Sequence, residues 1–180
     1  MNPSTDNPGS ACRGCGAIFP DVEGPVHRYM TSSPACWSAY GVVLAREYSD
    51  RAYASLYRLS VDAYAVQHPG SASPEAIQSV AVHLCRLCLI FEGGFSIENA
   101  NDAMLAIHQV ERSFRWLEPP RSRGQVTVAE VLAAQDVDEH LRQVKRWARS
   151  CWEAWTEHHA TIRTWLPTAA RAPAQNRTSD

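Results

Sequence analysis

Apolar residues recur at intervals of three and four along most of this 180-residue chain. Such spacing puts them on one face of an α-helix, whereas no segment alternates apolar and polar residues for long enough to indicate a strand. The sequence therefore predicts an all-α fold, a bundle of about five to six helices. The predicted helices are Pro34 to Ser49, Asp50 to Gln67, Pro74 to Glu92, about Glu98 to Leu117, Thr127 to Ala134, and Val137 to Leu166.

Local signals mark where several of these helices begin and end. Ser33 and Ser73 each precede a proline, which is the pattern of an N-cap residue followed by proline at the first helical position. The sequence His68-Pro69-Gly70 cannot continue a helix. The helix that starts at Pro74 is apolar nearly all round, which predicts that it is the central, buried helix.

The stretch before the first predicted helix carries thiols instead of a helical pattern. Cys12 and Cys15 form a C-x-x-C pair with a glycine on each side of the second thiol, which eases the sharp turn that two ligands of one ion require. Cys36 falls in the opening turn of the first helix, where the helix N-terminus favours a thiolate. This pattern is typical of a metal knuckle.

A fourth ligand is needed, because structural zinc sites are closed tetrahedra of cysteine and histidine. His27 is the natural fourth ligand, on a loop that its prolines and glycine make irregular. The sequence thus predicts a zinc-tied, irregular N-terminal arm over residues 11–37. The predicted zinc ligands are Cys12, Cys15, His27 and Cys36.

Two alternatives to this ligand set stay open. The C-x-x-C pair could be a redox motif, although such motifs sit in βαβ units and none is visible here. Cys85 and Cys88 form a second C-x-x-C pair, and two such pairs would make a site of four thiolates. They lie in an apolar helical run, where thiols are more often buried.

The hairpin around His68 predicts a second polar cluster. If the helices on either side of the turn pack antiparallel, Asp62 and His83 face each other, and His158 also points inward from the last helix. Asp62, His68 and His83 are therefore candidate catalytic residues of a general acid/base pocket, and a second metal near His83 and His158 is a further option. The alternative is structural, with buried histidines hydrogen-bonded to carbonyl or carboxylate groups.

Composition and charge narrow the class of protein. The chain is 45% apolar and 20% charged, with a net charge of -2 and both signs mixed along it, which argues against nucleic acid as a partner. The sequence predicts neither an export signal nor a membrane span, and hence a cytoplasmic protein with reduced thiols. It also predicts a single helical domain over 11–166, with flexible tails at 1–10 and 167–180. Nucleotide-binding glycine loops and serine-hydrolase motifs are absent from the sequence.

The chain contains C-x-x-C-G, G-P-x-H-x-Y and S-P-A-C-W, followed by V-D-A-Y-A-V-Q-H-P-G and A-V-H-L. Over about Cys12 to Phe91, these motifs resemble an uncharacterised family of small bacterial zinc-knuckle-like domains of unknown function. The resemblance implies no activity. The bundle is also loosely similar to metal-dependent helical transferases of the DinB type, a likeness of fold alone. The motif positions that the family resemblance supports are Cys12, Cys15, His27, Cys36, Asp62, Gln67, His68 and His83.

These observations favour a zinc-binding helical bundle with a small polar pocket, formed by Asp62, His68 and His83, that binds or transforms a small molecule. Whether it is an enzyme stays open. The alternative function is a zinc-stabilised protein-protein interaction module without catalysis, which would present the knuckle and the loop from Phe19 to Met30 to a partner.

Overall fold

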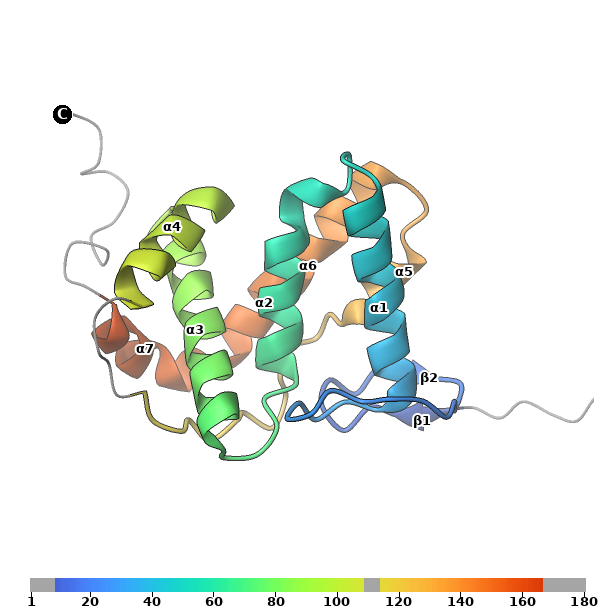
Figure 1. Ribbon diagram of the computed structural model, residues 1–180, viewed down its shortest axis with the longest axis horizontal. Helices are drawn as coiled ribbons and strands as arrows, with labels where there is room; N and C mark the ends of the chain where they lie inside the picture. Colours follow the sequence, from blue (N-terminus) through green and yellow to red (C-terminus); the bar gives the residue numbers. More distant parts are fainter. Residues whose placement is uncertain (1–8, 109–113, 167–180) are drawn as a thin grey trace, which may run out of the picture.

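The computed structural model describes residues 9–108 and 114–166. The described residues form an all-α fold with one small hairpin (Figure 1), which confirms the predicted class. The predicted tails at 1–10 and 167–180 lie outside this range except for residues 9 and 10. The elements are β1 (Ser10–Ala11), β2 (Ile18–Phe19), α1 (Pro34–Ser49), η1 (Ala54–Leu56), α2 (Tyr57–Gln67), α3 (Pro74–Phe91), α4 (Ile97–His108), α5 (Val128–Ala133), α6 (Val137–Ala154), η2 (Thr156–His158) and α7 (His159–Trp165).

Helices α2, α3 and α6 form the centre of the bundle. Figure 1 shows α2 and α3 side by side with α6 crossing behind them, while α1 packs on α2 and α5, and α4 and α7 pack on α3. The fully buried Trp147 and Trp155 project from α6 or its end, and Trp147 Nε1 donates to Gln67 Oε1 at 2.8 Å. Gln67 Nε2 in turn donates to the Val126 carbonyl at 2.9 Å, so both polar atoms of this buried side chain are paired.

Helix α3 is the central helix that its all-round apolar pattern predicts. Its length and composition would allow it to cross a membrane, although the sequence predicts no membrane span. Half of it is buried inside the bundle, against α2, α6 and α7. The apolar run is therefore explained by burial against neighbouring helices.

The last predicted helix, Val137 to Leu166, is in fact two helices. Helix α6 ends at Ala154, and a 3₁₀ turn redirects the chain into α7, which packs on α3. The His159 ring stacks on Trp152 at 3.7 Å between centroids, and its Nε2 bonds the Trp152 carbonyl oxygen at 2.9 Å. The Trp152 carbonyl also accepts a hydrogen bond from Trp155 N at 3.1 Å, so the His159 side chain adds a second donor at the end of α6.

Two other predicted helices are shorter than expected. Asp50 ends α1, and its carboxylate accepts a hydrogen bond from Ala52 N at 2.9 Å, so the chain turns before α2 begins at Tyr57. Helix α4 ends at His108; residues 109–113 lie outside the described part, and 114–117 are not helical. Aspartate at position 50 favours the turn before α2 because its side chain accepts a hydrogen bond from the backbone amide two residues on.

The N-terminal arm lies across the end of the bundle where α1 begins and α2 ends (Figure 1). In the arm, β1 and β2 pair antiparallel with Ser10 opposite Phe19. Arg123, which precedes α5, donates to the Gly14 carbonyl at 2.6 Å. Gly70, at φ +75°, lies so close to the Tyr29 carbonyl that a side chain there would overlap it. The arm is thus held against the turn that follows α2.

Candidate metal centre

Four side chains from three parts of the fold converge beneath the arm. Cys12 follows β1, Cys15 lies in the turn of the hairpin, Cys36 lies in the first turn of α1, and His68 directly follows α2. Their ligand atoms all lie within 4.8 Å of one another. Cys15 is half-buried and the other three are buried. The structure therefore contains a possible Cys₃His metal site.

The hairpin turn brings the first two thiols together. Cys12 N donates to the Ala17 carbonyl at 2.8 Å, and Gly16 N donates to the Cys12 carbonyl at 2.8 Å. Gly16 adopts φ +79°, a left-handed conformation that costs glycine little and other residues more. The C-x-x-C-G sequence thus folds into a compact loop with both thiols on its inner side.

The N-terminus of α1 supplies the third thiol. Ser33 caps this helix by accepting a hydrogen bond from Cys36 N at 3.2 Å, and Pro34 occupies the first turn. Ser33 N donates to Cys12 Sγ at 3.5 Å. A helix N-terminus carries partial positive charge, so this position favours a thiolate.

His68 supplies the nitrogen ligand and is fully buried. Its Nδ1 lies 2.8 Å from the Tyr64 carbonyl oxygen, to which it donates, and this bond leaves the Nε2 lone pair for a cation. The Tyr64 ring stacks on the imidazole at 4.0 Å, and the Tyr64 hydroxyl donates to Cys36 Sγ at 3.7 Å. One residue of α2 therefore orients two of the ligands.

The distances between donor atoms fit zinc. With sulfur at about 2.3 Å and nitrogen at about 2.0 Å from a tetrahedral zinc ion, two sulfurs lie about 3.8 Å apart and a sulfur and a nitrogen about 3.5 Å apart. Cys15 Sγ lies 3.7 Å from Cys36 Sγ, and Cys36 Sγ lies 3.4 Å from His68 Nε2. The donor set and its spacing therefore suit a closed tetrahedral site.

Hydrogen bonds among the sulfurs perturb their acidity. The pKa of Cys12 is held well below its usual range because the Cys15 and Cys36 thiols donate hydrogen bonds to its sulfur. The pKa of Cys15 is raised to about 12, chiefly by the same bond to Cys12, and the pKa of Cys36 is also raised by its bonds to both sulfurs. A divalent cation would stabilise all three thiolates at once, since a coordinating thiol is deprotonated.

His27, the expected fourth ligand, lies outside this cluster, and His68 takes its place. The half-buried His27 ring packs against Tyr29 and Trp37, with centroids 4.4 Å and 5.2 Å away. Its Nδ1 accepts a hydrogen bond from Tyr29 N at 3.5 Å, and burial lowers its pKa. His27 thus helps to shape the loop around Trp37.

The predicted polar pocket is divided between two places. Asp62 and His83 do meet, with Asp62 Oδ1 2.7 Å from His83 Nδ1, but His68 belongs to the metal cluster. His158 is also elsewhere, with Nε2 2.8 Å from the Glu118 carbonyl oxygen. Sequence reasoning missed Arg86, which lies one turn from His83 and donates from Nε to both Asp62 oxygens at 2.9 Å. The available signal was an arginine in an otherwise apolar helical run.

The alternative four-thiolate site is not formed. Cys85 and Cys88 lie in the core on α3, at 0% and 3% exposure, and neither belongs to the Cys₃His cluster. All six cysteines fall within the described residues, and none forms a disulfide. Burial raises the pKa of Cys88 to about 12, so this thiol stays protonated at neutral pH.

A known protein family shares most of this chain, including the four clustered residues. Residues 10–156, which include all four ligands, match the profile of a family of unknown function, DUF5946. The chain belongs to the DUF5946 family. The match extends from β1 to η2, so the family's common region includes the arm, the metal centre and most of the bundle. Beyond DUF5946, the chain matches no curated protein and no solved structure.

We expect Gly14→Ala to weaken metal binding at this site, with zinc as the probe, about tenfold to a hundredfold, the range found when groups that orient metal ligands are disturbed. A methyl group at Gly14 would overlap the His68 imidazole and the Thr31 carbonyl oxygen. Competition with a chromophoric chelator measures the affinity. Gly24→Ala is the matched control, because its new methyl group would meet open space. Equal affinities for the two variants would show that contact with Gly14 does not position His68.

Proposed function

We propose that the metal is zinc and that its role is structural. The observation that supports this role is the closed ligand set: three sulfurs and one imidazole fill a tetrahedron and leave no position for a substrate or water. The ion would join the hairpin, α1 and the end of α2, which makes the position of the arm depend on it. We further propose a cytoplasmic location, where thiols remain reduced and available to zinc.

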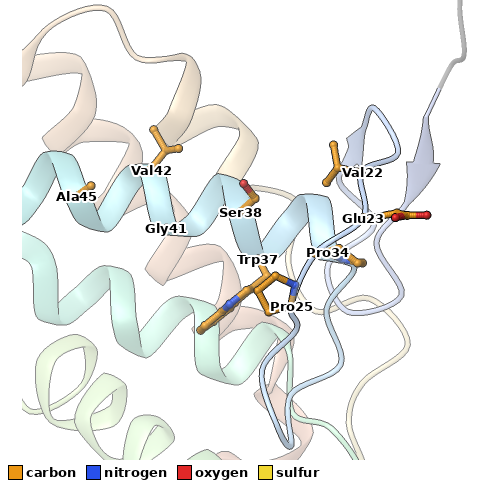
Figure 2. Close-up of a pocket in the computed structure, with 10 residues that line it drawn as sticks. Val22, Glu23, Pro25, Pro34, Trp37, Ser38, Gly41, Val42 and Ala45 are labelled. Atoms are coloured by element: carbon orange, nitrogen blue, oxygen red, sulfur yellow. The ribbon is translucent and has the colours of Figure 1, made fainter.

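The arm and α1 together border a surface groove of about 520 Å³. Figure 2 shows Trp37 beside Pro25 of the arm, with Gly41, Val42 and Ala45 further along α1. Val22 and Val42 are 49% and 51% exposed. The groove lies between the loop from Phe19 to Met30 and helix α1. That loop is part of the surface expected of the interaction-module alternative, and α1 adds the other side of the groove.

We propose that this groove binds an amphipathic helix of a partner protein. Gly41 and Ala45 are one turn apart on α1 and carry little or no side chain. They therefore let another helix approach α1 closely, between Val22 and Val42. Among the described residues that line the groove, Glu23 is the only charged one. A helix with an apolar face and a lysine or arginine beside it therefore fits the groove best.

The proposal is tested by photocrosslinking in native host cells, with benzoylphenylalanine placed at Val42 in the full-length protein. We expect crosslinks to one recurring helical segment with a basic residue beside its apolar face. A synthetic peptide of that segment should bind the zinc-loaded protein, and Val42→Asp should weaken this binding about tenfold or more by burying a carboxylate against apolar groups. Chelation of the metal should abolish binding, because the arm forms one wall of the groove.

Leu105 on α4 provides the control position, since it is also an exposed apolar residue, at 59% exposure. Benzoylphenylalanine at Leu105 should not capture the same segment, and Leu105→Asp should leave peptide binding unchanged. The partner proposal fails if Val42 crosslinks only to a second copy of this chain. It also fails if the peptide binds the Val42→Asp variant as tightly as the original protein.

A second candidate function is small-molecule binding at Asp62 and His83. It is favoured by the 2.7 Å contact between a carboxylate that is almost completely buried and an imidazole whose side chain is 20% exposed. A carboxylate in this position orients the ring, and the other ring nitrogen is left to a ligand or a proton. This candidate keeps two of the three expected pocket residues and assigns no reaction.

A further inference from the structure

A buried polar cluster joins α2, α3 and α4. Asp62 of α2 is 1% exposed and accepts hydrogen bonds from two side chains of α3, His83 and Arg86. Arg86 also donates from Nη1 to Asn101 Oδ1 of α4 at 3.0 Å. His83 and Arg86 are three residues apart, which places them on the same face of α3.

Arg86 has one donor group without a hydrogen-bond partner in the part of the chain that the structure describes. The residue is 6% exposed, and Nη2 is a buried side-chain atom with no hydrogen-bond partner among the described residues. A buried donor without a partner is destabilising, and more so when the group is charged. Such a group points to a partner outside the described residues, such as a bound ligand.

Arg86 Nη2 and the His83 ring lie beside the same carboxylate, that of Asp62. In a planar guanidinium, Nη2 lies on the same edge as the Nε–H, and Arg86 Nε donates to both oxygens of Asp62 at 2.9 Å. His83 Nδ1 contacts that same carboxylate, so the unused donor and the imidazole flank one group. With Nδ1 donating to Asp62, Nε2 of a neutral His83 carries a lone pair, and the His83 side chain is 20% exposed, so part of it is open to a small ligand.

We propose that His83 and Arg86 bind an oxyanion that also carries a hydroxyl group, such as a hydrogen phosphate group or a 2-hydroxycarboxylate. An oxygen of the ligand accepts from Arg86 Nη2, and its hydroxyl donates to His83 Nε2. The Asp62 carboxylate orients both side chains, and its negative charge disfavours an anion that presents acceptors alone. This proposal rests on the second candidate function and names the ligand class of that site.

Titration of the isotope-labelled, zinc-loaded protein tests the proposal, with the side-chain ¹⁵N signals of His83 and Arg86 as the readout. The probes are two pairs of anions, inorganic phosphate with sulfate and lactate with acetate; the first member of each pair carries a hydroxyl near neutral pH. We expect phosphate or lactate, or both, to bind saturably and roughly tenfold more tightly than its partner, the worth of about one hydrogen bond. Comparing the two pairs identifies which oxyanion the site takes.

His83→Phe should remove this preference, because phenylalanine keeps the ring and lacks the acceptor. His159→Phe is the matched control, a half-buried histidine of a different cluster, and should leave the preference intact. Equal binding of both members of each pair, or a preference that survives in His83→Phe, would overturn the proposal and indicate an adventitious ion only. The same holds if no saturable shift occurs up to about 50 mM, far above the ~1 mM Kd of a weak site.

A panel of neutral and cationic small molecules separates this proposal from the function on which it rests. If His83 responds to members of that panel and to none of the anions, the ligand class is wrong and the small-molecule site stands. If it responds to neither set, both proposals fail.

Discussion

Removal of the proposed zinc ion should lower the free energy of unfolding by more than about 4 kcal/mol, the stabilisation from a ligand present at 1,000 times its Kd. The expectation follows from the position of the Cys₃His cluster, whose ligands join the hairpin, α1 and the residue after α2. Only the folded chain holds these groups together, so binding free energy becomes folding free energy. Denaturant unfolding of the zinc-loaded and chelated protein, with metal content measured in parallel, tests the prediction.

Single variants identify the fourth ligand. Purified protein should contain one zinc per chain, and Cys36→Ser and His68→Ala should lose it, because each removes a donor of the cluster. His27→Ala is the matched control and should retain the metal, since its ring packs on Tyr29 and Trp37 instead. Zinc retained in His68→Ala and lost in His27→Ala would contradict the assigned ligand set.

Asp62→Ala should destabilise the protein by about 3–5 kcal/mol, the cost of breaking a buried ion pair by removing one partner. The Asp62 and Arg86 side chains are 1% and 7% exposed. Without its carboxylate, the Arg86 guanidinium remains in the core with no compensating charge, and both Arg86 Nε and His83 Nδ1 lose an acceptor. Chemical denaturation followed by tryptophan fluorescence measures the loss.

The controls for this prediction separate burial from pairing. Glu92→Ala breaks a similar carboxylate–arginine contact with Arg163, but those side chains are 30% and 49% exposed, so it should cost less than about 1 kcal/mol. The double variant Asp62→Ala, Arg86→Met should recover most of the stability lost in Asp62→Ala, because it removes the unpaired charge. Equal losses for Asp62→Ala and Glu92→Ala would show that burial of the pair does not set its contribution.

Local sequence signals predicted the helices well where they act within a few residues. The Ser33 and Ser73 caps form as expected, and Thr127 and Glu130 form a capping box before α5, so α1, α3 and α5 begin where the sequence indicates. The breaks after Asp50 and Ala154 were missed. The break after Asp50 is a local turn that its own side chain stabilises, at a residue where the sequence predicted the start of the second helix. The break after Ala154 depends on distant packing, since α7 leaves the direction of α6 to pack on α3. The three-and-four spacing of apolar residues continues through such a break, so the spacing does not show where one helix ends.

The positions of three ligands follow from local sequence signals, whereas the position of the fourth depends on tertiary packing. Cys12 and Cys15 are brought together by a turn that the neighbouring glycines allow. Cys36 is positioned by a helix start that the Ser33 cap defines. The fourth ligand depends on how the end of α2 packs beneath the hairpin, 32 residues from Cys36 along the chain. No local signal distinguishes the looped His27 from His68 before that packing is known.

The sequence by itself determined the all-α class, the helix starts and three thiols arranged for a metal, because these follow from side-chain periodicity and contacts within a few residues. The tertiary structure decided which histidine completes the Cys₃His cluster and which side chain pairs with Asp62. Both choices are made between residues 24 to 32 positions apart, where the packing of α2 against its neighbours sets the distance. Contacts of that range depend on the packing of the whole bundle, which local pattern does not encode.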